Sequence, residues 1–176
     1  MLTINPESKS ECVERAAELL CVAARTAPKG RGRDLLVTAV VSGVELGRLA
    51  DTMRLIAERD QVAFIARDAG NLALASALVL IGTRMEPLGL PHCGYCGFVD
   101  CAAMQAAGAT CAFATGDLGI AVGSAVSRAA DLRLDNRVMY SAGKAAIEMG
   151  LLGEGVRIAY AIPLSVSGKS PFFDRG

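Results

Sequence analysis

The sequence predicts an α+β protein with a cysteine-rich loop inserted into it. Its 176 residues are 52% apolar and 20% charged, a composition that suits a globular domain with a well-formed core. Segments with helical periodicity are interspersed with three short apolar runs typical of strands, at residues 35–41, 77–82 and 156–162. Four of the six cysteines lie between the second and third runs. We therefore expect a single domain over residues 1–176, with residues 92–111 as the insertion.

The first half of the chain predicts three helices around the first two strands. Residues 5–25 begin with an Asn-Pro pair, which suits an N-cap and a first helical position, and continue with apolar residues at helical spacing. Residues 42–45 have the pattern of a capping box, which predicts a second helix that continues to about Asp60. Residues 62–68 predict a short third helix before the second strand.

The second half predicts helices at residues 100–107, 117–132 and 138–149. In the middle one, small residues recur every four positions: Gly119, Gly123 and Ser127. A glycine inside a helix costs about 1 kcal/mol relative to alanine, so some contact is expected to compensate. Small residues let two helix backbones approach closely, and we expect another helix to pack there, with a flat ligand as the alternative.

The insertion carries four thiols within 19 residues, at Cys93, Cys96, Cys101 and Cys111. Thiolates bind soft metal centres, and an iron–sulfur cluster needs several of them from one tightly turned segment. Gly94 and Gly97 give the backbone the freedom to turn, because glycine reaches positive φ without a steric clash. The spacing predicts a 4Fe-4S cluster. Zinc remains the alternative, although a structural zinc site usually has two Cys-x2-Cys pairs and this chain has one.

A loop at residues 26–34, broken by proline and glycine, carries three basic side chains, and Arg25 precedes it. It is either a solvated surface segment or an anion site, since glycine-rich turns and guanidinium groups suit a phosphate. The formal net charge of the chain is zero, which argues against a general nucleic-acid binder. Its apolar runs are too short to cross a membrane, and its N-terminus lacks the order of a signal peptide. We therefore expect a cytoplasmic protein.

The stretch CGYCGFVDCAAMQAAG (93–108) resembles the small iron–sulfur domain in electron-transfer and corrinoid proteins of anaerobes, although the fourth cysteine comes sooner here. Over nearly its whole length, the chain also resembles an uncharacterised family named for its ferredoxin domain. Five segments carry this second resemblance: residues 23–34, the cysteine loop, and residues 114–125, 135–146 and 162–176. Both resemblances imply an iron–sulfur protein.

The order of elements, with the motifs at residues 23–34, 117–125 and 162–175, resembles the flavin-dependent nitroreductase fold. That fold is an α+β sheet flanked by helices in a tight dimer. The resemblance implies a homodimer and an FMN site whose phosphate contacts come from basic residues: Arg25, Lys29, Arg31, Arg33, Lys169 and Arg175. The cysteine loop has no counterpart in that fold.

Three functions follow as hypotheses. The first is an iron–sulfur redox protein that passes single electrons to a partner, either a protein or a small molecule. The second, implied by the nitroreductase resemblance, is a flavin-dependent oxidoreductase. The third is a non-catalytic interaction module stabilised by zinc or a cluster, which the lack of an obvious acid–base constellation favours. If the chain is an enzyme, we expect an oxidoreductase, and the sequence indicates no catalytic residue.

Overall fold

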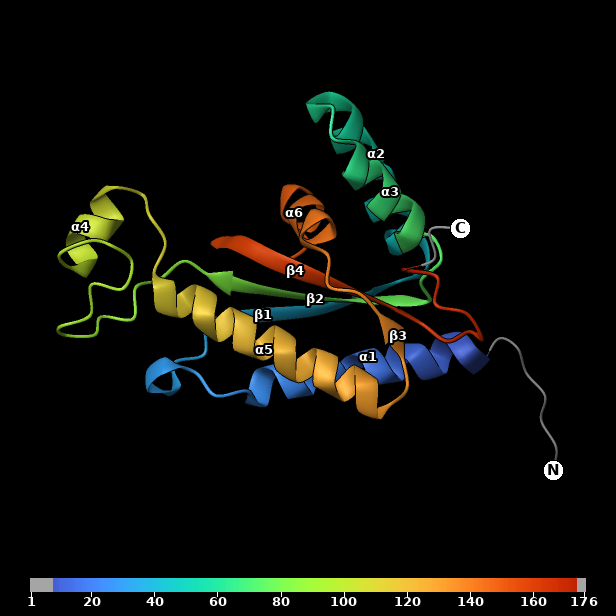
Figure 1. Ribbon diagram of the computed structural model, residues 1–176, viewed down its shortest axis with the longest axis horizontal. Coiled ribbons are helices and arrows are strands. Elements are labelled where there is room, and N and C mark those ends of the chain that lie inside the picture. The colour runs from blue at the N-terminus through green and yellow to red at the C-terminus, as the bar shows by residue number, and fades with distance from the viewer. Residues whose placement is uncertain (1–7, 174–176) are drawn as a thin grey trace.

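A four-stranded antiparallel sheet with strand order β1-β2-β4-β3 forms the centre of the computed structural model, which describes residues 8–173 (Figure 1). The strands are β1 (Leu36–Ser42), β2 (Ala77–Arg84), β3 (Asp135–Asn136) and β4 (Val156–Ser165). The α-helices are α1 (Ser8–Thr26), α2 (Gly43–Asp60), α3 (Ala63–Leu72), α4 (Cys101–Ala106), α5 (Ala112–Asp131) and α6 (Tyr140–Glu148), and one 3-10 turn covers Gly30–Gly32. None of the helices in this described part is long and apolar enough to cross a membrane.

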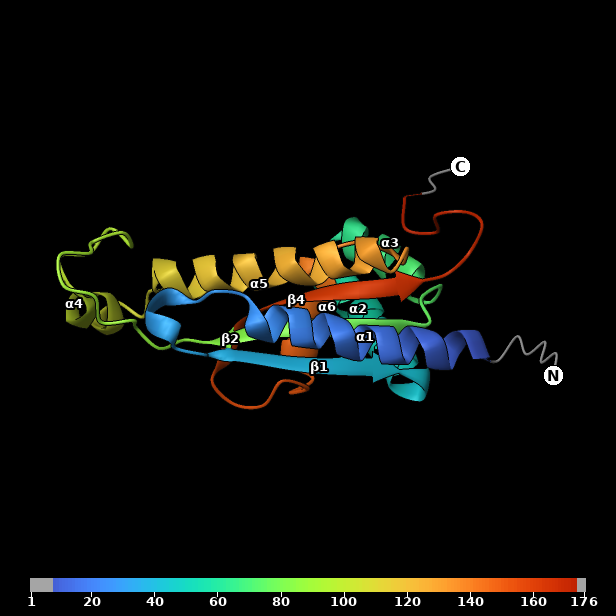
Figure 2. The ribbon, with the colours of Figure 1, turned by 90° about the horizontal axis from the view of Figure 1, so that it is seen from below.

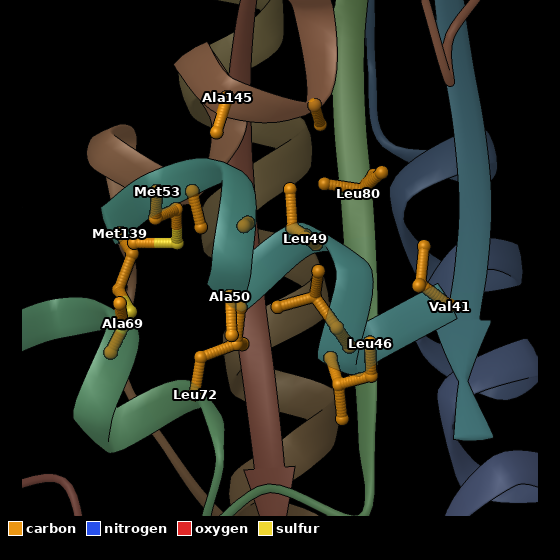
Figure 3. Close-up of a cluster of buried hydrophobic side chains, with 14 of the residues drawn as sticks. Val41, Leu46, Leu49, Ala50, Met53, Ala69, Leu72, Leu80, Met139 and Ala145 are labelled. Atoms are coloured by element: carbon orange, nitrogen blue, oxygen red, sulfur yellow. The ribbon is translucent and has the colours of Figure 1, made fainter. Parts of the chain in front are cut away.

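Helices cover both faces of the sheet. On one face α1 and α5 lie side by side, and Leu20 and Leu118 are fully buried there (Figure 2). On the other face α2, α3 and α6 bury a second cluster that includes Leu49, Met53 and Leu80 (Figure 3). Residues 77–83 of β2 are all buried, because this strand lies between two others and under both helical layers.

The three predicted strands are confirmed, and β2 and β4 continue two and three residues further than predicted. The capping interaction predicted for the second helix is wrong. Ser42 does precede α2, but its side chain makes no capping hydrogen bond, and Glu45 instead pairs with Arg48 at 2.8 Å. The predicted helix start at Asn5 lies outside the described residues.

Two predictions about the long glycine-containing helix are corrected. It begins at Ala112, five residues before the predicted start. The expected helix contact at Gly119 and Gly123 is absent from the described chain: both are exposed, and a Cβ added at either would meet nothing within 4 Å. The neighbouring helix α1 packs on another side of α5, where the Ser124 hydroxyl donates to the Ala23 carbonyl at 2.8 Å. The glycine-bearing surface of α5 is therefore available to another molecule.

The cysteine loop and the basic loop lie at the same end of the molecule. Residues 85–111 extend past the end of β2, and they place α4 well away from α2, α3 and α6 (Figure 1). The segment between α1 and β1, with its 3-10 turn, lies at that end too. Two segments about 60 residues apart in the sequence therefore become neighbours.

Candidate metal centre

All four cysteines of the insertion line one cavity of about 130 Å³: Cys93, Cys96, Cys101 and Cys111. The first three are half-buried, Cys111 is 8% exposed, and none forms a disulfide. Within residues 8–173, no three His, Cys, Asp or Glu side chains converge closely enough to hold a single metal ion. The four cysteines are grouped around one shared space.

Tight backbone geometry brings the first three cysteines around this cavity. Gly94 and Gly97 have φ of 65° and 83°, a region that glycine enters without strain, and the Gly97 N–H donates to the Gly94 carbonyl at 2.9 Å. Three residues after Gly97, the Asp100 carboxylate accepts from the Ala103 N–H at 2.8 Å. This N-cap starts α4 at Cys101, so a turn and a capped helix fix the loop on both sides of Cys96.

The fourth cysteine reaches the cavity from a different element. Cys111 is the residue that immediately precedes α5, and it is buried with Leu88, Met104 and Ala114 in a small apolar cluster. Partly buried side chains pack around this cluster: Met85, Leu90, Cys96, Phe98, Ala109 and Phe113. An apolar shell of this kind limits water access to a metal centre and influences its redox potential.

A larger cavity of about 450 Å³ lies beside the first one, and Ala112 lines both. Its wall includes Tyr95 from the cysteine loop and Phe113 from α5, whose rings stack with centroids 5.5 Å apart and an interplanar angle of 9°. Lys29 and Gly30 of the basic loop line its other side. The two cavities therefore share one lining residue, and the larger one has aromatic side chains in its wall.

Asp117 joins the basic loop to α5. Its two carboxylate oxygens accept from the backbone N–H of Gly30 at 3.1 and 3.0 Å, across 87 residues of sequence. The sequence suggested Asp117 only as the residue that starts a helix. Because α5 begins at Ala112, the Asp117 side chain is one turn inside the helix and faces the loop instead.

We predict that Asp117→Ala lowers the free energy of unfolding by about 1 to 3 kcal/mol, because the part-buried Gly30 N–H loses its charged acceptor. Urea unfolding followed by circular dichroism measures this change. Asp131→Ala is the matched control on the same helix, since Asp131 is exposed and lies 3.6 Å from Arg128. We expect the control to change stability by less than about 0.5 kcal/mol. Equal losses in the two variants would show that the Asp117 contact adds nothing.

Two of the predicted phosphate contacts hold the end of α1. The Arg25 guanidinium donates to Asp34 and to the Leu36 carbonyl, both at 2.8 Å. Burial opposes ionisation of Asp34, but the hydrogen bonds from Arg25 and the Leu36 N–H outweigh it and lower the pKa of this carboxyl. The Lys29 ammonium donates to the carbonyls of Arg25 and Ala27, at 2.6 and 2.8 Å.

The other two cations of the loop contact the segment that leads into the cysteines. Arg31 donates to the carbonyls of residues 88 and 89, both at 3.4 Å. Arg33 donates to the Pro87 carbonyl at 3.1 Å and forms an ion pair with Glu86. The structure thus brings Arg25, Lys29, Arg31 and Arg33 to one end of the molecule, with each engaged by its own chain.

Lys169 does not lie with these four residues. Lys169 follows β4, whose Leu164 pairs with Ala77 at the start of β2, whereas the basic loop contacts residues beyond the end of β2 (Figure 1). Lys169 therefore lies toward the opposite end of the sheet within one chain. Arg175 lies outside the described residues.

Comparison with known families matches the sequence to an uncharacterised protein family containing a ferredoxin domain, over residues 107–175. That segment includes Cys111 and begins after the other three cysteines of the cavity. The chain is also 39% identical over 183 aligned residues to an uncharacterised protein from Archaeoglobus fulgidus, an alignment that covers 99% of this chain and 98% of that one.

Among solved structures, the chain is similar to the FMN-dependent nitroreductase NfnB from Mycobacterium smegmatis in complex with NADPH. The TM-score is 0.62 at 12% identity, with 90% of this chain and 81% of that chain covered. A nitroreductase with bound FMN from Desulfitobacterium hafniense gives a TM-score of 0.60 at 17% identity, with coverage of 89% and 79%. The α+β nitroreductase-like fold predicted from the sequence is confirmed.

Proposed function

Because this chain belongs to the uncharacterised protein family containing a ferredoxin domain, we propose that it is an iron–sulfur redox protein. A 4Fe-4S cluster would be held by four thiolates: Cys93, Cys96, Cys101 and Cys111. The observation that supports this most directly is the single cavity of about 130 Å³ that all four line. Thiolates are the ligands that an iron–sulfur cluster requires, and the chain has one Cys-x2-Cys pair where a structural zinc site usually has two.

When bound, such a cluster accepts and releases single electrons. The chain's own residues hold and shield it. Gly94 and Gly97 allow the first turn to wrap around the site, and Met104 and Leu88 exclude water from its inner side. Cys111 stands at the N-terminal end of a 20-residue helix, where the partial positive charge of the helix favours an anionic sulfur.

Elemental analysis of protein purified without oxygen tests this proposal. We expect about four iron and four sulfide per chain, and a visible absorption that dithionite bleaches as the cluster takes up an electron. Electron paramagnetic resonance of the reduced sample identifies the cluster type. A colourless protein with one zinc per chain would overturn the proposal and leave the metal-stabilised interaction module.

A flavin in the neighbouring cavity is the second candidate, and it would make the protein an oxidoreductase. The cavity of about 450 Å³ has the size of a cofactor site, and the stacked rings of Tyr95 and Phe113 offer a flat apolar surface. Lys29 and Gly30 of the predicted phosphate loop line it. The two nitroreductases of similar fold are described as FMN-dependent and FMN-bound. A flavin there would occupy a cavity that shares Ala112 with the cysteine cavity.

A phosphate in this site would have to compete with the carbonyls that the loop cations already contact. Both hydrogen bonds of Arg31 are 3.4 Å long, whereas Arg25, Lys29 and Arg33 each have a shorter one, so Arg31 is the most easily redirected. We predict that FMN fluorescence is quenched on mixing and that Arg31→Gln weakens binding about tenfold. Arg48→Gln, a change at an exposed cation on α2, is the control. Unquenched fluorescence at all protein concentrations contradicts flavin binding.

We also propose that the protein is a homodimer through the outer surface of α1 and α5 (Figure 2). Leu19, Val22 and Ile120 are exposed on these helices at 44%, 57% and 49%, and Gly119 and Gly123 of α5 are exposed as well. An apolar surface of this kind with open space above its glycines suits close approach by a second copy. Within one chain Lys169 lies away from the basic loop, and a second copy could bring its own Lys169 towards that loop.

Light scattering after gel filtration tests the dimer through Gly119→Leu. A Cβ added at this exposed position meets nothing within 4 Å, so we expect the fold to be retained while the helices of two copies are forced apart. We expect the measured mass to fall from that of two chains to that of one. Gly47→Leu, at an exposed and equally open position on α2, should leave the mass unchanged. A wild-type mass of one chain contradicts the dimer.

A further inference from the structure

A third cavity, of about 240 Å³, lies between α6 and β4 and shares no lining residue with the two described above. Tyr140, Lys144 and Ile147 line it from α6, at spacings of four and three that put them on one side of the helix. Residues 157–160 of β4 form the rest of the wall. Neither the proposed cluster nor the proposed flavin uses this cleft.

The walls of the cleft are held together by a very close contact. A Cβ added at Gly143 of α6 would lie 2.1 Å from the carbonyl oxygen of Ala159, so only glycine allows the helix to sit this near the strand. The contact fixes α6 against β4 immediately beside the cavity. The cleft is therefore a preformed feature of the fold.

Two cations line the cleft, Lys144 and Arg157. Asp60 at the end of α2 and Glu148 at the end of α6 are both paired with Arg59, at 2.7 and 3.1 Å. The pKa of Asp60 is lowered chiefly by its hydrogen bond from Arg59, and the charge of Lys144 has the smallest effect on it. Within residues 8–173, no hydrogen bond or ion pair engages the Arg157 guanidinium. In a chain with no net charge, this cleft is locally cationic.

The rest of the lining suits an apolar ligand body. It includes Ile147 and Ile158 and two of the chain's three tyrosines, Tyr140 and Tyr160. A tyrosine presents an apolar ring and a hydroxyl that can donate to an anion. At about 30 Å³ for a water-sized group, 240 Å³ holds about eight such groups, the size of a six-membered ring with a carboxylate.

We infer that this cleft binds a small carboxylate with a ring-sized apolar body. The carboxylate lies between Lys144 and Arg157, where charge-assisted hydrogen bonds hold it. The ring lies against Tyr140 and Ile147 of α6. This site is independent of the cysteine cavity, so it stands whether the metal centre proves to be iron–sulfur or zinc.

The absence of tryptophan makes the site directly observable. In a Tyr95→Phe variant the emitting residues of the chain are Tyr140 and Tyr160, and both line the cleft. Cyclohexanecarboxylate is the probe, because it does not absorb where tyrosine is excited. We expect a saturable change in tyrosine fluorescence. In the same background, the combined Lys144→Gln and Arg157→Gln changes should weaken binding about tenfold or more, and Arg48→Gln should not.

Two further probes separate the parts of the inference. Cyclohexylmethanol lacks the charge and acetate lacks the ring, and equally tight binding of either one would overturn it. The absence of a saturable fluorescence change would also overturn the inference. So would a double variant that keeps its melting temperature and binds the probe as tightly as its parent. Amide NMR shifts caused by the probe must centre on residues 157–160, and shifts centred on Phe113 would place the ligand in the wrong cavity.

Discussion

Replacing Cys96 with serine is expected to remove most of the iron and sulfide from protein purified without oxygen. Cys96 lines the cavity and packs against the apolar cluster around Cys111, so its sulfur faces the proposed cluster from the protein side. A serine hydroxyl is a harder ligand and stays protonated at neutral pH, so it does not replace a thiolate on iron. Iron and sulfide per chain, together with the visible absorption, measure the loss.

Cys12→Ser is the matched control. Cys12 is exposed on α1, on a helix that contributes nothing to the cysteine cavity, and its replacement should leave iron and sulfide unchanged. The melting temperature of the Cys96→Ser variant distinguishes a redox role of the metal from a structural one. A folded variant without electron transfer indicates a redox centre, whereas unfolding without any redox change indicates a structural one. Full iron content in Cys96→Ser would refute the assignment of this ligand.

The grouping of the cysteines could be predicted because it is local. Cys93 and Cys96 are only three residues apart and are joined by the turn at Gly94 and Gly97, so they cannot lie far from each other. The second cavity could not be predicted in the same way. It depends on Tyr95 stacking against Phe113 and on Asp117 holding Gly30 across 87 residues. Periodic patterns in the sequence do not predict contacts between residues far apart in the chain, because such contacts form only when distant elements pack together.

The glycines of α5 show what a spacing pattern can and cannot predict. Their spacing of four places Gly119 and Gly123 on one side of a helix, and this part of the prediction is confirmed. The pattern does not specify what lies opposite, and the described chain leaves that side open. The strand β3 was missed for a simpler reason. At two residues, Asp135–Asn136, it is too short to produce an alternating pattern and exists only because β4 pairs with it.

Replacing glycine with alanine is expected to change the stability of the protein in opposite directions at two helical positions. At Gly143 the new methyl group would lie 2.1 Å from the carbonyl oxygen of Ala159 and 2.6 Å from its carbon. Both are backbone atoms of β4, which is hydrogen-bonded to β2 in the middle of the sheet and cannot move alone. We expect Gly143→Ala to cost about 3 kcal/mol, at the upper end for overpacking, and to lower the melting temperature by about 6 to 12 °C.

Gly47 provides the comparison, because it lies inside α2, is exposed, and would place a Cβ in open space. Alanine has the higher helix propensity and fewer unfolded conformations, so Gly47→Ala should raise stability by about 0.5 to 1 kcal/mol. Thermal unfolding of both variants measures the difference in sign. A Gly143→Ala protein that melts at or above the wild-type temperature would mean that α6 stands further from β4 than the 2.1 Å approach requires. The melting temperature of Gly143→Ala therefore tests how closely α6 approaches β4. The same contact fixes the cationic cleft.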